Sequence, residues 1–241
     1  MVSSRLLIGA VTATASLFLM PVTSWLDGLP NFTLTSSALA SSPELTIQNF
    51  SYVPPYRGTP RRTQGTGSRG GDPSESIRLK LLVPSDHTGQ TLSGHPTFFW
   101  QISELPAEAM EFSLVESGVA QPIFVQQLKP QKAGIIRMEM PKNLPELVPG
   151  KEYRWSVTVI DNANQRANDT FAQSWIKRVP ETPELQQQLA TAKSDRDRAS
   201  IYAKAGLWYD ALNSLLTAQA ANSADSSIHE ELLALLARAG L

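Results

Sequence analysis

The spacing of apolar residues changes at Pro180, and this change constrains the fold more than any other feature of the chain. From Ile77 to Val179, apolar and polar residues alternate with a period of two, which is typical of half-buried antiparallel strands. After Pro180 the apolar period lengthens to that of an amphipathic helix. We therefore expect a mainly β protein with α: a β domain over residues 77–180, followed by a helical segment over residues 181–241.

The β part is expected to form an antiparallel β-sandwich. Turn residues such as Pro149-Gly150 and Asp161-Asn162 separate about seven short apolar runs, and strands at such spacing are typical of sandwiches. The segments 96–100 and 147–157 resemble the early and late strands of an immunoglobulin-like or fibronectin type III-like domain. The expected strands lie at residues 77–83, 97–102, 110–114, 123–127, 134–140, 153–159 and 170–176.

The helical part resembles a single tetratricopeptide unit. Pro183 suits the first position of a helix, Ser194 with Asp197 forms a capping-box variant, and Gly206 permits a turn into the next helix. Ser227-x-x-Glu230 is expected to open a last helix. Because a solenoid groove needs about three repeats, we expect a compact helical hairpin. Its small and bulky wedge positions are Ala199, Tyr202, Gly206, Trp208, Ala211, Leu215 and Ala218.

Residues 1–40 have the pattern of a signal peptide. Arg5 is the only charged residue before Asp27, and Leu6 to Met20 is apolar except for Gly9 and small hydroxyl residues. Ala38-Leu-Ala40 is the preferred cleavage site, with Val22-Thr-Ser24 an earlier candidate. We expect export to the periplasm or the extracellular space. The alternative is an uncleaved anchor, since about 20 apolar residues can span a bilayer, and this is the only membrane contact we expect.

Residues 41–76 predict an extended or disordered linker. Pro, Gly, Arg and Ser dominate from Ser51 to Ser76, and no apolar period is present. Basic and aromatic residues gather here, and in the envelope they could bind an anionic polysaccharide or lipid head group. A solvated linker is the favoured explanation, because charge beside Gly and Pro keeps a segment extended. The patch consists of Arg57, Arg61, Arg62, Arg69, Tyr52 and Tyr56.

Composition excludes several classes of function. The chain has 241 residues, a net charge of -1 and no cysteine. The absence of a basic excess argues against nucleic-acid binding, and the absence of cysteine excludes disulfides, thiolate catalysis and cysteine-based metal sites. His87, His95 and His229 lack metal-ligand spacing. We expect each to be a surface or turn histidine, and we expect no cofactor.

Two oxygen-rich groups offer alternatives that we do not favour. Glu104, Glu108 and Glu111 could supply the carboxylate pair of a glycan-cleaving enzyme, but their position predicts a solvated loop. The polar loop with Asp161-Asn162-x-Asn164 and Asn168-Asp169 could ligate calcium through oxygen, but Asn and Asp are also common in tight turns. We therefore predict no catalytic residue and no metal ligand.

Several short motifs, taken in order, resemble a cyanobacterial family of exported proteins known as domain-of-unknown-function family 928. Each motif alone is common, and their order and spacing make the match specific from about residue 50 to 241. The resemblance implies location and architecture, and it carries no activity, cofactor or catalytic residue. The motifs are Arg57-Gly-Thr-Pro60, Gly67-Ser-Arg-Gly70, His95-Pro-Thr-Phe-Phe-Trp100, Gly150-Lys-Glu-Tyr-Arg-Trp155, Trp175-Ile-Lys-Arg-Val179 and Ala205-Gly-Leu-Trp-Tyr-Asp-Ala-Leu212.

These observations predict an exported, non-catalytic protein that binds another envelope protein. The alternative is a carbohydrate-binding or carbohydrate-acting sandwich. The candidate interaction surface combines Arg57, Arg61 and Arg62 with Trp208 and Tyr209. We expect one of these two aromatic rings to fill the wedge between helices and the other to face solvent.

Overall fold

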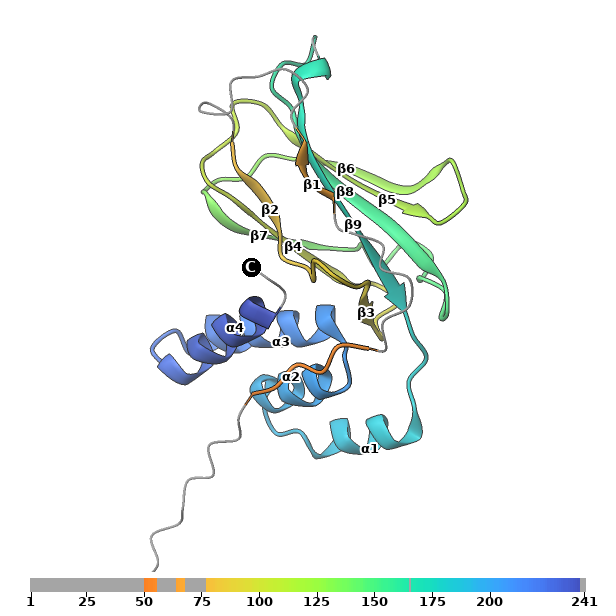
Figure 1. Cartoon of the computed structure of the whole chain (residues 1–241), viewed down its shortest axis with the longest axis vertical. Helices are drawn as coiled ribbons and strands as arrows, with labels where there is room; N and C mark the ends of the chain where they lie inside the picture. The colour runs from red at the N-terminus through yellow and green to blue at the C-terminus, as the bar shows by residue number, and fades with distance from the viewer. Residues whose placement is uncertain (1–49, 56–63, 68–76, 165, 239–241) are drawn as a thin grey trace, which may run out of the picture. The chain divides into compact units, whose positions relative to one another are not determined.

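Two sheets make up the β part of this computed structural model, which describes residues 50–55, 64–67, 77–164 and 166–238 (Figure 1). The larger sheet has the order β1-β9-β8-β5-β6, with β3 also pairing with β9, and the smaller has the order β2-β4-β7. All pairs are antiparallel except β3 with β9. The strands are β1 (Gln64–Gly67), β2 (Leu79–Leu81), β3 (Gly89–Thr91), β4 (Thr97–Ile102), β5 (Met110–Glu116), β6 (Pro122–Leu128), β7 (Gly134–Glu139), β8 (Glu152–Val159) and β9 (Thr170–Arg178).

Alternating side chains of these strands form the core between the two sheets. In β8 the buried positions are Tyr153, Trp155, Val157 and Val159, every second residue of the strand. The ring of Phe98 on β4 lies 4.9 Å from that of Phe112 on β5 and 5.0 Å from that of Trp155 on β8, measured between centroids. Aromatic pairs at such distances contribute stability beyond the area that they bury.

The seven predicted strands are confirmed, and two more were missed. The strand β3 reads Gly-Gln-Thr and carries no apolar alternation, so its backbone pairing with β9 leaves no pattern in the sequence. The strand β1 lies inside the predicted linker. Its pairing with β9 means that part of residues 41–76 belongs to the larger sheet, contrary to the prediction of a linker throughout.

Four α-helices follow the last strand: α1 (Pro183–Thr191), α2 (Asp195–Lys204), α3 (Trp208–Ala221) and α4 (Ser226–Arg238). The predicted starts of α1 and α2 are confirmed, because the Thr182 and Ser194 hydroxyls accept hydrogen bonds from backbone N–H groups inside their helices. The start of α4 differs from the prediction. The Asp225 carboxylate accepts from the backbone N–H of Ser227 at 3.0 Å, so Asp225 takes the capping role expected of Ser227.

The helices pack against one another and against the sheets. Small residues on α2 and α3, among them Ala199, Ala203 and Ala211, are completely buried, as the predicted close crossing requires. Gly206 joins the two helices with a φ of +76°. The residues from Ile47 to Leu241 form one compact unit, so the helices and sheets share a single core.

A strap formed by residues 50–55 crosses the helical part. Its Val53 N–H donates to the carbonyl of Ala203 at 3.0 Å, and Tyr52 is 3% exposed. A Cβ on Gly206 would lie 2.9 Å from the Val53 carbonyl oxygen, so the strap and the helix turn fit only with glycine at this position. This is the second departure from the linker prediction. The aromatic side chain of Tyr52 enters the core and thereby orders this Pro-rich segment.

No helix in the described part of the chain is both long and apolar enough to cross a membrane. The predicted signal peptide and cleavage sites lie outside the described residues, as do Arg57, Arg61, Arg62, Arg69 and Tyr56.

Candidate functional site

A cleft of about 750 Å³ lies where β3, β4 and β7 meet α2 and α3. Strand residues such as Thr97 and Arg137 line one side, and helix residues such as Arg198, Tyr202 and Asn213 line the other. Its volume is in the range of sites that hold small molecules or short polymer segments. The cleft is therefore the candidate site among the residues that the structure describes.

Asp210, in the first turn of α3, ties the helix to β3 at the cleft. Its carboxylate accepts hydrogen bonds from the Thr91 hydroxyl at 3.2 Å and from the Leu92 backbone N–H at 3.0 Å. Burial raises the pKa of this carboxyl group to about 6, although these hydrogen bonds act in the opposite direction. Asp210 therefore holds the floor of the cleft in place and carries a charge that depends on pH near neutrality.

Arg178, near the end of β9, fixes another wall of the cleft. Its guanidinium donates to the carbonyl of Leu92 at 3.1 Å and to the carboxylate of Glu146 at 2.8 Å, and also to the carbonyl of Leu147. Its side chain is 18% exposed. These bonds join three segments distant in sequence, so Arg178 positions the cleft wall.

The rim of the cleft carries charges of both signs, and two pairs of them are in contact. Arg137 contacts Glu139 at 2.7 Å and donates to Asn213 on α3 at 3.2 Å, while Arg198 contacts Asp195 at 2.8 Å. Four basic and four acidic side chains line the cleft, so their formal charges cancel. The basic residues are Arg137, Lys142, Arg178 and Arg198, and the acidic residues are Glu139, Glu181, Asp195 and Asp210.

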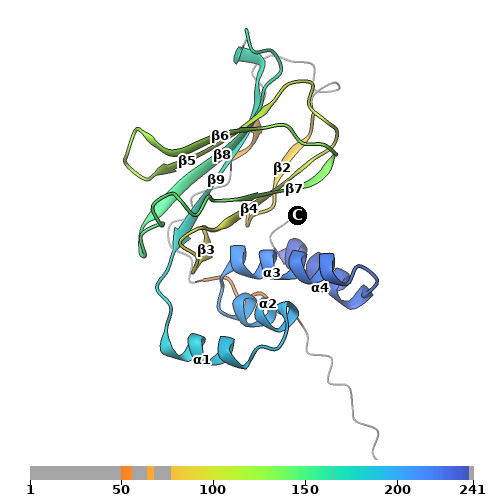
Figure 2. The same ribbon diagram turned by 180° about the vertical axis from the view of Figure 1, so that it is seen from behind.

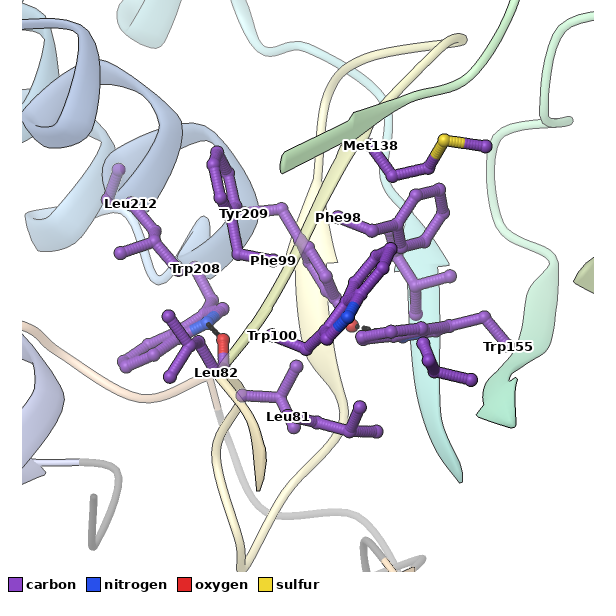
Figure 3. Close-up of a cluster of buried hydrophobic side chains, with 14 of the residues drawn as sticks. Leu81, Leu82, Phe98, Phe99, Trp100, Met138, Trp155, Trp208, Tyr209 and Leu212 are labelled. Carbon is purple, nitrogen blue, oxygen red and sulfur yellow. Dashed lines mark hydrogen bonds between the residues drawn. The ribbon is translucent and has the colours of Figure 1, made fainter. Parts of the chain in front are cut away.

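Trp208 and Tyr209 connect α3 to the sheets, contrary to the prediction that one of their rings faces solvent (Figure 3). They are 0% and 2% exposed. The Trp208 indole N–H donates to the carbonyl of Leu82 at 2.9 Å. The Tyr209 hydroxyl accepts from the Trp155 indole at 2.8 Å and donates to the carbonyl of Trp175 at 3.1 Å. An isolated helix hairpin would leave one ring exposed, but docking on the sheets buries both.

A chain of hydrogen bonds runs from the buried Tyr52 through the buried His87 to the exposed Asp86. The Tyr52 hydroxyl lies 2.7 Å from His87 Nε2, and His87 Nδ1 lies 2.7 Å from the Asp86 carboxylate. The order hydroxyl, imidazole, carboxylate is that of a nucleophilic catalytic triad, but Tyr52 and His87 are only 3% and 6% exposed. Burial, with a smaller contribution from the negative charge of Asp86, raises the pKa of Tyr52. The phenol therefore stays protonated and ties the strap to the loop before β3.

The remaining sequence candidates lie apart. His95 Nε2 is 2.8 Å from the carbonyl of Leu144, while His229 pairs with Gln219 on α3. Glu104 and Glu108 are exposed on a loop, as expected. His87 was expected at the surface and is instead buried, because the strap covers it. Within the described ranges, no group of three His, Asp or Glu side chains could hold a metal ion.

No sequence pattern predicted the cleft, because its lining residues come from both the strands before Pro180 and the helices after it. Asp210 lies within the tetratricopeptide-like motif, and its bonds to Thr91 and Leu92 span more than a hundred residues. A carboxylate in the first turn of an apolar helix was the available signal, but it is also an ordinary feature of helix starts.

The comparisons with known proteins identify one family. A family model described as Domain of Unknown Function (DUF928) matches residues 64–241. No curated protein matches the chain. Among solved structures, the chain is similar to an engineered protein from a structural genomics consortium at 10% identity and a TM-score of 0.30. That match covers 43% of this chain and 20% of the engineered chain.

Proposed function

Because this chain belongs to the DUF928 family, a domain of unknown function, its role must be inferred from its geometry, and we propose that it is an exported, non-catalytic binding protein of the cell envelope. Its ligand is a segment of another envelope protein that enters the cleft between the sheets and the helices. The observation that carries this proposal is the cleft itself, whose walls are fixed before any ligand arrives.

Preformed walls favour binding, because a ligand does not have to order them. Asp210 and Arg178 are each held by several hydrogen bonds across the cleft walls, so little conformational entropy is lost there on association. The rim pairs Arg137–Glu139 and Arg198–Asp195 present donors and acceptors side by side. A protein segment with backbone amides and side chains of both signs matches such a rim, and electrostatic complementarity of this kind gives specificity.

Carbohydrate binding is the second candidate, and Tyr202 is the observation that favours it. This half-buried tyrosine lines the cleft and could stack against a sugar ring. The tryptophans in the described part of the chain argue against a carbohydrate site, because they offer no exposed ring for a sugar. Trp100, Trp155 and Trp208 are fully buried, and Trp175 is half-buried. We favour the protein ligand for this reason.

Sequence patterns support the proposed location, and contacts between elements support the finer fold assignment. The apolar run and small-residue site in residues 1–40 support export, as does the resemblance to exported cyanobacterial proteins. The contact of Phe98 with Phe112 and Trp155 across the two sheets supports an immunoglobulin-like or fibronectin type III-like sandwich. The close α2–α3 crossing supports a tetratricopeptide-like origin for the helix pair.

N-terminal sequencing of the protein recovered from the native organism tests export. We expect the chain to begin near Ser41, after the Ala38-Leu-Ala40 site. An intact Met1 on a freely soluble protein would contradict the proposed localisation.

The binding proposal is tested by crosslinked capture from the envelope with charge-reversed variants. Deletion of residues 182–241 is unsuitable, because it would remove the Trp208 and Tyr209 contacts of the core. We propose the pair Lys142→Glu and Arg198→Glu at the cleft rim, with Lys80→Glu and Lys132→Glu at exposed positions as the matched control.

The captured protein is identified, purified and titrated against each variant. We expect the cleft variant to bind at least about ten-fold more weakly than the wild type, since juxtaposed like charges are strongly unfavourable, and we expect the control to match the wild type. Equal binding by both variants would contradict the assignment of the cleft. A glycan array bound by the wild type and lost in Tyr202→Ala would favour the carbohydrate candidate instead.

A further inference from the structure

The outer edge of β6 is a surface that the proposed function does not use. This strand ends the larger sheet and pairs with β5 alone among the described strands. The β5–β6 hairpin extends away from the helices in both views (Figures 1 and 2). The backbone N–H and C=O groups along the outer side of an edge strand are free to pair with another strand.

This edge lacks the charged residues that protect most exposed strands. No charged residue occurs between Pro122 and Leu128, and Val125 is 49% exposed. The edge strand β7 of the smaller sheet differs, since it carries the Arg137–Glu139 pair, and the other edge strand, β2, carries exposed Lys80. Charges, above all lysine, are the usual protection against pairing between edges. The edge of β6 is therefore the one of these three most open to an added strand.

The sequence of β6 is complementary to itself in the antiparallel direction. A register shift at Ile123 leaves a regular segment from Phe124 to Leu128, and Gln126 is its centre. A two-fold axis at Gln126 would place Phe124 of each copy opposite Leu128 of the other, and Gln126 opposite Gln126. Phe124 and Leu128 would form apolar pairs, Val125 would lie opposite Gln127, and the two central amides could exchange hydrogen bonds.

No like charges meet in this register. The nearest charged residue along the chain is Lys129, which would lie opposite Ile123 of the second copy. The two Lys129 residues would be separated by six positions, about 20 Å along the strands, which exceeds the screening length of about 8 Å at physiological salt. Like-charge repulsion therefore does not oppose the pairing of residues 124–128. The register shift at Ile123 and Pro122, which lacks a backbone N–H, both lie outside this segment.

We propose that two copies of this chain associate through β6, joining their larger sheets into one continuous antiparallel sheet. The contact is isologous, so it closes at a dimer and leaves no β6 edge open for further growth. The junction is small, so we expect a weak dimer that forms only at high protein concentration. The cleft plays no part in this contact.

A single cysteine tests the register, because the chain has none of its own. Gln126→Cys would face its own copy at a Cα separation of about 4.5–5.5 Å, within the range of a disulfide. The matched control is Gln121→Cys, at an exposed position before the strand. We expect Gln126→Cys to form a covalent dimer at least about ten-fold faster under mild oxidation, since the pairing holds its thiols together. Equal rates would overturn the proposal.

Sedimentation of the mature chain over a concentration series up to 200 µM supplies the second test. Gln126→Lys places two lysines opposite each other, so we expect the dissociation constant to rise at least about ten-fold, while Gln121→Lys leaves it unchanged. A wild-type chain that stays monomeric, or a dimer unaffected by Gln126→Lys, would overturn the proposal. Failure of this proposal leaves the binding function of the cleft intact, because the two use different surfaces.

Discussion

The first turn of α3 and the edge strand β6 differ in exposure to solvent. The first turn of α3 is buried against the sheets, whereas β6 has one side open to solvent. In α3, the large side chains of Trp208 and Tyr209 have their polar atoms paired with the sheets. In β6, uncharged residues with free backbone groups face outward. The first arrangement makes the helices part of the core and builds the cleft, whereas the second leaves a surface suited to another chain. Substitutions in the two regions should therefore differ sharply in their effects on folding.

The largest expected effect comes from removing the Trp208 side chain. Trp208→Ala empties a fully buried site and removes the hydrogen bond to Leu82, so we expect a loss of about 3–5 kcal/mol in the free energy of unfolding. Chemical denaturation measures it. Val125→Ala in β6, where the side chain is 49% exposed, is the comparison and should cost less than about 1 kcal/mol. Similar losses of unfolding free energy for the two variants would contradict the difference in burial between the two regions.

The next effect concerns the strap over the helix turn. Gly206→Ala introduces a Cβ 2.9 Å from the Val53 carbonyl oxygen at a positive φ, whereas Gly118 has a positive φ with open space around it. We expect Gly118→Ala to cost about 1–2 kcal/mol for the backbone alone. Gly206→Ala should cost about 1–3 kcal/mol more, because the strap must move. Thermal denaturation of both variants measures the difference, and equal costs would mean that the strap does not rest on Gly206.

Removing a single hydroxyl from α3 should have a smaller effect. Tyr209→Phe leaves the Trp155 indole N–H and the Trp175 carbonyl without this partner, and we expect a loss of about 1–3 kcal/mol. The half-buried Tyr202 offers a matched substitution, and Tyr202→Phe should change stability by less than about 0.5 kcal/mol. If Tyr209→Phe were as stable as the wild type, the hydroxyl could not be the tie between helix and sheets.

The last expected effect is a pH dependence at the cleft, which differs from the others because it appears only over a limited pH range. The pKa of Asp210 is raised from 3.8 to about 6 in the folded protein. The folded state therefore holds this proton more tightly than the unfolded state, and the resulting stability is lost as pH rises from about 4 through 6. Asp210→Asn should flatten this decline in melting temperature.

Asp225 provides a control of opposite sign. The Ser227 hydroxyl and backbone N–H lower the pKa of its carboxyl group, so its contribution is present above its ordinary pKa and is lost as pH falls below it. Asp225→Asn should leave the slope between pH 4 and 6 unchanged. If Asp210→Asn kept the wild-type slope, its carboxylate would not be the titrating group.

Local signals in the sequence predicted the elements well but not their assembly. The alternation in β8, Pro183 at the start of α1 and the cap at Ser194 depend on neighbouring residues, so they are visible along the chain. The burial of Tyr209 and the contact of Asp210 with Leu92 depend on docking between distant segments. A short strand such as β3 is ordered by pairing with β9, and its Gly-Gln-Thr sequence carries no period. The cleft forms where the helices dock on the sheets, so no local sequence motif predicts it.

We expect the helices and sheets to fold as one body, because the cleft exists only where both are present. The most direct test is chemical denaturation of a Trp208→Phe variant, which can be followed by far-ultraviolet circular dichroism at 222 nm for the helices and by tryptophan fluorescence for the sheets. In this variant the remaining tryptophans of the described residues, Trp100, Trp155 and Trp175, all lie on strands. We expect one cooperative transition with coincident midpoints. A helical signal that is lost at a lower denaturant concentration than the tryptophan signal would contradict it.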